Sequence, residues 1–113
     1  MILPEDGHLL RMLIGENDRY GGKPLYEWLV VKARESGLAG ATVTKGIMGY
    51  GANSVIHTSK ILRLSEDLPV IIEIVDSKEN LETFLRDVDN VIEVGLATRE
   101  KAEVRFYRHK DPE

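Results

Sequence analysis

Residues 37–51, which read GLAGATVTKGIMGYG, carry most of the information about the fold. The stretch opens on a glycine that stops a helix, and residues 41–47 then alternate as a strand does. It ends in closely spaced glycines, and a second apolar run, LPVIIEIVD, follows at residues 68–76. The polar segment between them, residues 49–67, is longer than an ordinary connection, and loops of that length are usually functional. The pattern predicts two strands that present a long, ligand-responsive loop.

The segment before this stretch predicts one strand and one helix. Residues 8–15 alternate loosely, with apolar side chains on both faces, which indicates a strand covered on most of both sides. A helix is expected to begin at Pro24, because proline at the first helical position loses no hydrogen bond. Leu25, Leu29 and Ala33 share one side of that helix, which ends before Gly37.

The segment after the loop predicts a central strand and a second helix. Residues 70–75 are almost all apolar, as expected for a strand in the middle of a sheet. Either Asp76 or Ser77 caps the helix that follows, and Glu79 is placed to form a capping box with Asp76. We therefore expect a helix that packs on the sheet.

The remaining elements rest on weaker patterns. Residues 95–100 are expected to form a loop, and residues 61–64 a short strand or turn. Val104 and Phe106 alternate with polar side chains, which predicts the fourth strand over residues 103–107.

The order of elements is strand-helix-strand-strand-helix-strand. This order predicts an α+β, ferredoxin-like fold over one domain, residues 1–113: an antiparallel four-stranded sheet with both helices on one face. The other face would carry apolar side chains, namely Leu9, Leu13, Ile71 and Val75. Faces of this kind often associate with copies of themselves, so the sequence predicts a homo-oligomer.

Composition excludes several classes of protein. The net charge of −4 argues against broad nucleic-acid binding, and the absence of cysteine excludes disulfides and thiolate chemistry. No apolar run has the roughly 20 residues that a membrane helix needs, and the first residues do not resemble a signal peptide. We expect a cytoplasmic protein, and abundant Glu, Lys and Arg fit a thermophilic source.

Residues with catalytic or metal-binding spacing are absent. No nucleophile-base grouping can be recognised, and His8, His57 and His109 lack the spacing of metal ligands, so neither an enzyme nor a metal site is predicted. Gly46, Gly49 and Gly51 fit two interpretations. Their backbone N–H groups could approach an anion, or they could form a bulge that ends the strand.

The order of motifs resembles the PII nitrogen-signalling superfamily. Its closer resemblance is to a PII-like family of bacterial and archaeal proteins, the family of domain of unknown function 190. The residues that carry it are GKPLYE at 22–27, GATV at 40–43, GI-x-GYG at 46–51, IHTS at 56–59, LS-x-DLP at 64–69 and GLAT at 95–98.

This resemblance implies a ferredoxin-like homotrimer that binds an adenine nucleotide, ADP or AMP above all, between subunits. The loop over residues 49–67 would correspond to the T-loop, which reports the ligand to a protein partner such as a transporter. Residues 95–99 would stand where PII proteins keep the phosphate-binding B-loop. The expected nucleotide-binding residues are Gly46, Ile47, Gly49, Tyr50, Gly51, Gly95, Leu96, Ala97, Thr98, Arg99, Arg105 and Arg108.

Some PII features are missing. Residues 52–67 contain no tyrosine, so uridylylation does not carry over, and the B-loop lacks the Thr-Gly and Gly-Asp-Gly-Lys elements. Two alternatives stay open. One is a small trimeric enzyme or metal-binding protein that resembles the cation-tolerance trimers, in which His57 would act with Glu66 or Asp67. The other is an adaptor whose loop docks a partner without a small ligand.

Overall fold

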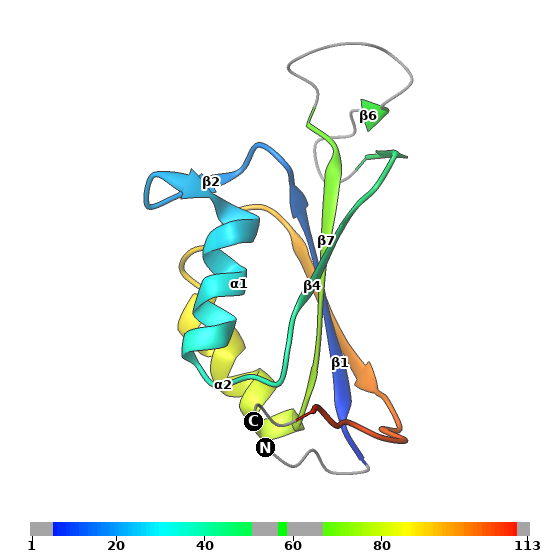
Figure 1. Cartoon of the computed structure of the whole chain (residues 1–113). Helices are drawn as coiled ribbons and strands as arrows, with labels where there is room; N and C mark the ends of the chain where they lie inside the picture. The colour runs from blue at the N-terminus through cyan, green and yellow to red at the C-terminus, as the bar shows by residue number, and fades with distance from the viewer. Residues whose placement is uncertain (1–5, 51–56, 59–66, 111–113) are drawn as a thin grey trace.

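A four-stranded antiparallel sheet forms the centre of the molecule (Figure 1). The computed structural model describes residues 6–50, 57–58 and 67–110. The strands lie in the order β4 (Thr42–Lys45), β7 (Pro69–Asp76), β1 (His8–Gly15) and β8 (Leu96–Lys101). β7 separates β4 from β1, and β1 separates β7 from β8. This is the predicted split strand-helix-strand arrangement, so the ferredoxin-like fold is confirmed.

Two short ladders lie beside the sheet. β2 (Arg19–Tyr20) pairs with β3 (Lys23–Pro24) just before the first helix. β5 (Met48–Gly49) continues the chain after β4 and pairs with β6 (His57–Thr58). The predicted loop over residues 49–67 therefore begins as a strand, because Gly49 pairs with His57. This pairing was not predicted, since His57 and Thr58 carry no recognisable strand pattern. The short strand predicted at residues 61–64 lies outside the described residues.

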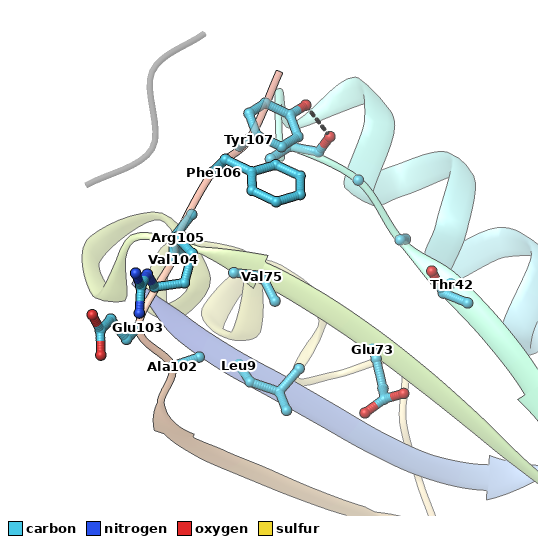
Figure 2. A pocket seen from close by; sticks show the side chains of 13 residues that line it. Leu9, Thr42, Glu73, Val75, Ala102, Glu103, Val104, Arg105, Phe106 and Tyr107 are labelled. Carbon is cyan, nitrogen blue, oxygen red and sulfur yellow. Dashed lines mark hydrogen bonds between the residues drawn. The ribbon is translucent and has the colours of Figure 1, made fainter. Parts of the chain in front are cut away.

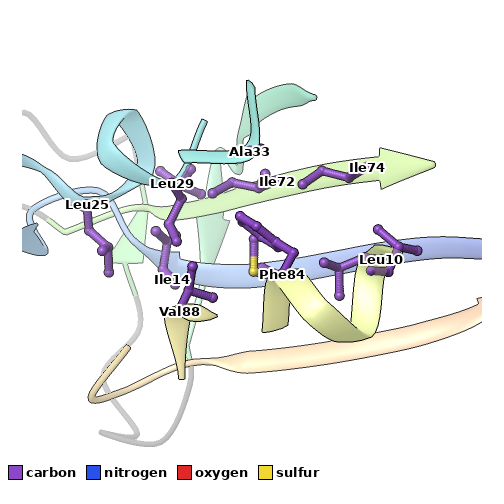
Figure 3. Close-up of a cluster of buried hydrophobic side chains, with 12 residues drawn as sticks. Leu10, Ile14, Leu25, Leu29, Ala33, Ile72, Ile74, Phe84 and Val88 are labelled. Carbon is purple, nitrogen blue, oxygen red and sulfur yellow. The ribbon is translucent and has the colours of Figure 1, made fainter. Parts of the chain in front are cut away.

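Both helices, α1 (Leu25–Glu35) and α2 (Lys78–Val88), cover the same face of the sheet (Figure 1). Burial alternates along β1 and β7, so every second side chain points toward the helices. Twelve buried apolar side chains from these four elements form the core (Figure 3): Leu10, Met12, Ile14, Leu25, Leu29, Ala33, Val70, Ile72, Ile74, Leu81, Phe84 and Val88.

The N-terminus of α2 is organised by Ser77 and by the buried carboxylate of Asp76. The Ser77 hydroxyl accepts a hydrogen bond from the backbone N–H of Asn80, which confirms Ser77 as the cap. Asp76, only 1% exposed, accepts from the backbone N–H groups of Ser77 (2.7 Å) and Ala39 (2.8 Å) and from Asn80 Nδ2 (2.9 Å). The predicted capping box with Glu79 is wrong, because the third helical position is Asn80 and the Asp76 side chain bridges to the α1–β4 connection instead.

The position of the fourth strand was predicted wrongly. The edge strand is β8, at residues 96–101, where a loop was expected, and residues 103–107 form no strand. β8 lacks an apolar alternation because its side chains, except that of Arg99, are exposed. The alternation of Val104 and Phe106 is not explained by pairing in this chain.

The helix-free face of the sheet is less apolar than predicted. Leu9, Leu13, Ile71 and Val75 are only partly buried there, as expected. Between them, however, Arg11 Nη2 lies 3.0 Å from Glu73 Oε2, and Arg11 Nη1 lies 3.6 Å from Glu100 Oε1. An ion cluster therefore separates two apolar zones of this face.

Candidate functional site

The base of the long loop is shaped by close contact with Pro69. The Gly46 N–H donates a 2.7 Å hydrogen bond to the Pro69 carbonyl. A Cβ atom at Gly46 would lie 2.7 Å from Pro69 Cγ, and one at Gly49 would lie 3.0 Å from the same atom. Both glycines are therefore needed for packing, which supports the structural interpretation of these two positions. Gly51 lies outside the described residues.

Large side chains stand out into solvent around this base. Ile47 is 73% exposed, Met48 58% and Tyr50 72%. A group of large apolar and aromatic side chains exposed side by side commonly marks a contact surface, whereas single exposed apolar side chains are ordinary. The loop base therefore offers exposed apolar area.

The segment predicted as a phosphate-binding loop is mostly strand. Leu96, Ala97, Thr98 and Arg99 belong to β8, and the connection between α2 and β8 is residues 89–95. A Cβ atom on Gly95 would lie 2.9 Å from the Leu13 carbonyl oxygen, so this glycine lets the chain enter the sheet beside β1.

Arg99 is held on the helix side of β8. Its Nε lies 3.0 Å from Glu82 Oε2 on α2, and its Nη1 lies 2.9 Å from Nδ1 of His8. Since arginine only donates, Nδ1 of His8 is the acceptor. The Arg99 guanidinium therefore links the edge strand to α2 within one protomer.

The sheet brings two of the predicted segments to the same end. Leu13 pairs with Leu96, and Lys45 pairs with Val70, which places the loop base and the start of β8 together. The charges described there do not suit a phosphate as they stand, because Lys45 Nζ is paired with Glu16 Oε2 at 3.0 Å.

The C-terminal arginines lie at the opposite end. His8, at the start of β1, pairs with both Asp76 and Lys101, so the segment after β8 leaves from the far end of the sheet. Arg105 and Arg108 are exposed on this segment, and the Arg108 guanidinium carbon lies 4.5 Å from the Phe106 ring centroid.

A groove of about 570 Å³ lies between this segment and the helix-free face of the sheet (Figure 2). Leu9 and Val75 line it from the sheet, and Phe106 and Tyr107 line it from the segment. The Tyr107 hydroxyl donates a 2.7 Å hydrogen bond to the Ala39 carbonyl, which fixes the tip of the segment near the start of β4. No spacing of residues along the chain predicted this groove.

The predicted site residues thus fall into two groups within one protomer. Gly46, Ile47, Gly49, Tyr50, Gly95 and Leu96 lie at the loop end of the sheet, whereas Arg105 and Arg108 lie at the other end; Ala97, Thr98 and Arg99 lie between them along β8. A single copy of the chain does not bring these groups together.

The described ranges also bear on metals and membranes. No grouping of three or more His, Asp or Glu side chains that could hold a metal ion occurs among residues 6–50, 57–58 and 67–110. Neither α1 nor α2, the two helices of this part of the chain, is long and apolar enough to cross a membrane.

Solved structures with the same fold are PII-like proteins. The chain matches the PII-like nitrogen regulatory protein CPII from Thiomonas intermedia, solved with ADP, AMP and bicarbonate, with a TM-score of 0.66 and 16% identity over 87% of both chains. It matches a putative PII-like signalling protein from Thermus thermophilus with a TM-score of 0.62 and 18% identity, covering 87% of this chain and 88% of that one. At such identities the likeness establishes the fold alone.

Sequence relatives define the family. A UPF0166 protein from Aquifex aeolicus is 41% identical over 98 residues, covering 87% of this chain and 92% of that protein. A UPF0166 protein from Methanocaldococcus jannaschii is 40% identical over 84 residues, covering 74% and 77%. The model of the DUF190 family, described as uncharacterised ACR, matches residues 7–104. The chain therefore belongs to the DUF190 (UPF0166) family, as its motifs predicted.

Proposed function

We propose that this protein is a cytoplasmic, non-catalytic regulator of PII type that binds an adenine nucleotide, ADP or AMP, between the subunits of a homotrimer. The observation that carries the proposal is the fold, which the chain shares with CPII, a protein solved with ADP and AMP. The nucleotide would be contacted by the residues predicted above, including Gly51 but not Arg99, whose guanidinium is bonded to Glu82 and His8.

The division of these residues between two ends of the sheet supports an intersubunit site. The loop end supplies backbone glycines and the exposed Tyr50, which can cover a base, but its cation Lys45 is paired with Glu16. The other end supplies Arg105 and Arg108, whose guanidinium groups suit a phosphate. The two groups complement each other only if they come from neighbouring copies.

The helix-free face supports the assembly itself. Leu9, Leu13, Ile71 and Val75 remain partly exposed there, and Leu96 is 59% exposed on the adjoining edge strand. A ring of three copies would cover this face in each protomer. Head-to-tail contacts that close into a ring leave every copy with the same covered interface.

The proposed output is a change at the loop over residues 49–67. A ligand can shift a two-state equilibrium only by its differential affinity for the two states. Contacts with Gly49, Tyr50 and Gly51 would give the nucleotide that difference, and a protein partner, such as a transporter, would recognise the loop in one state.

Thermal unfolding with and without nucleotide tests the binding. A ligand at 100 times its Kd adds about 2.7 kcal/mol to the free energy of unfolding. With about 2.1 cal/mol/K of unfolding entropy per residue, a chain of 113 residues should gain on the order of 10 °C in Tm. ADP, AMP and ATP are compared separately, which also ranks the number of phosphates.

Arginine variants connect that shift to the site. Arg108→Ala should abolish most of the nucleotide-induced shift while leaving the Tm of the nucleotide-free protein nearly unchanged. Arg34→Ala, which removes an exposed arginine from α1, is the matched control and should keep the full shift. No shift with any adenine nucleotide, together with a clear shift on adding a divalent metal, would instead favour the metal-binding alternative that involves His57.

A further inference from the structure

The segment after β8 has the sequence of a strand but pairs with none of the described strands. Val104 and Phe106 alternate with Glu103, Arg105 and Tyr107, a pattern typical of a half-buried strand. In the described parts of the chain, Ala102 N–H bonds to the Gly7 carbonyl at 2.9 Å, and no backbone-backbone hydrogen bond involves residues 103–107. Phe106 is 71% exposed. Residues 103–107 therefore have the side-chain pattern of a paired strand without the backbone hydrogen bonds of one.

The edge of the sheet formed by β4 has unpaired backbone groups that could accept such a segment. β4 pairs with β7 on one side only, and no described strand lies on its other side. All four of its residues, Thr42, Val43, Thr44 and Lys45, are exposed. Alternate residues of such a strand point their N–H and C=O groups away from the sheet, where they form a template for another strand.

The segment cannot form this ladder with its own β4. It crosses the end of the sheet over Leu9 of β1 and Val75 of β7, and it reaches Ala39 only at Tyr107 (Figure 2). It therefore runs across the strands and meets the chain before β4 begins at Thr42.

A second copy of the chain can supply a strand partner both for the segment and for the β4 edge. Among the described residues, each copy has a strand-like segment and a β4 edge that pair with no other strand, so a ring in which each copy donates its segment to the next would pair both. The side chains are also compatible, because the β4 edge presents Val43 between two threonines, and the segment presents Val104 and Phe106, residue types that form favourable cross-strand pairs.

We propose that residues 103–107 of one copy pair with β4 of the neighbouring copy and add a strand to its four-stranded sheet. This inference rests on the homotrimer of the proposed function and specifies how its subunits join. It also brings Arg105 of the donor to the β4 edge of the acceptor, the strand that leads into the loop base. The strand pairing would then explain why the proposed nucleotide site is divided between two copies.

Disulfide trapping tests the pairing directly, because the chain has no cysteine of its own. Two double variants are made in the full chain, Thr44→Cys with Val104→Cys and Val43→Cys with Val104→Cys, so that both faces of β4 are sampled. Paired strands bring opposite Cα atoms to about 4.5–5.5 Å, within the range of a disulfide. At least one variant should give covalent dimers and trimers on a non-reducing gel, and dithiothreitol should return them to monomers. Val31→Cys with Val104→Cys, which places the thiol on the exposed side of α1, should remain monomeric on the gel.

Light scattering of the same samples separates the outcomes. A trimer in which neither pair cross-links would overturn the strand pairing and leave the trimeric nucleotide site standing. A monomer would overturn both. If a cysteine variant fails to fold, hydrogen exchange of the Val104→Pro and Arg105→Pro proteins gives an independent answer, because one of two successive residues donates its N–H to the neighbouring strand and proline has no N–H to donate. In at least one of the two proteins, amides of β4 should then exchange at least tenfold faster than in the unmodified protein while those of β1 do not change; unchanged exchange in β4 of both would contradict the pairing.

Discussion

The carboxylate of Asp76 should be one of the most stabilising polar groups in this protein. It is almost fully buried and accepts hydrogen bonds from two backbone N–H groups, those of Ala39 and Ser77, as well as from the Asn80 side chain. Through these bonds it joins the end of β7, the start of α2 and the connection that leads into β4. Asp76→Ala removes both acceptor oxygens, and with them all three hydrogen bonds, from one buried position.

The magnitude follows from the groups left behind. A buried donor without a partner costs about 1–3 kcal/mol, and the Asn80 amide can turn to water because that residue is exposed. Two backbone donors left without a partner then cost about 2–6 kcal/mol. Alanine also removes the cost of burying a charged carboxylate, which places the net loss of unfolding free energy near 3 kcal/mol. Asp76→Asn keeps one oxygen acceptor and should lose roughly half as much.

Urea unfolding followed by circular dichroism measures the loss at a fixed protein concentration, since assembly contributes to stability. With an m-value of about 2 kcal/mol/M, a loss of 3 kcal/mol moves the midpoint by roughly 1.5 M. Asp87→Ala, an exposed aspartate of α2, is the matched control and should change stability by less than about 0.5 kcal/mol. If Asp76→Ala loses less than about 1 kcal/mol, the two N–H groups have found other partners and the reasoning is refuted.

Two further predictions concern the loop base and the helix-free face. Gly46→Ala should cost about 1–3 kcal/mol, because its Cβ would lie 2.7 Å from Pro69 Cγ, and the combined variant with Pro69→Ala should recover part of that loss in urea unfolding; equal losses with and without Pro69→Ala would show that the contact is not the cause. Arg11→Ala should weaken the proposed trimer in sedimentation at micromolar concentration, because an assembled face would bury Glu73 without its partner, whereas the exposed control Arg34→Ala should not. An unchanged trimer would mean that the Arg11–Glu73 pair stays in water, where it is worth only about 0–1 kcal/mol.

The parts of the fold that the sequence predicts are those in which burial imposes a period. β1 and β7 were expected at residues 8–15 and 70–75, because both pack against helices on alternate residues. The two helices were predicted for the same reason, from the apolar stripes that cover the sheet. The edge strand β8 could not be predicted in this way, because it faces solvent at almost every position and Leu96–Lys101 shows no apolar alternation.

The candidate site was harder to predict because its parts meet only through the sheet and, as proposed, through assembly. The glycines at 46 and 49 were found from spacing, but their contact with Pro69, twenty or more residues away, is a consequence of strand register. Arg99 looked available for a ligand, since sequence order does not reveal that α2 places Glu82 beside it. The alternation at residues 103–107 predicted a strand that the structure does not form within this chain, and the strand partner that we propose for it belongs to a second copy.

The β5–β6 ladder has a consequence for how members of this family can diverge. Pairing of Met48 with Thr58 and of Gly49 with His57 fixes the two ends of residues 50–56 a strand's width apart, whatever those residues are. Closing a flexible loop costs only about 0.6 kcal/mol more when its length doubles. Insertions, deletions or a grafted peptide within residues 50–56 should therefore leave the four-stranded sheet intact. Under the proposed function, the recognised partner could then change while the nucleotide-binding fold stays the same.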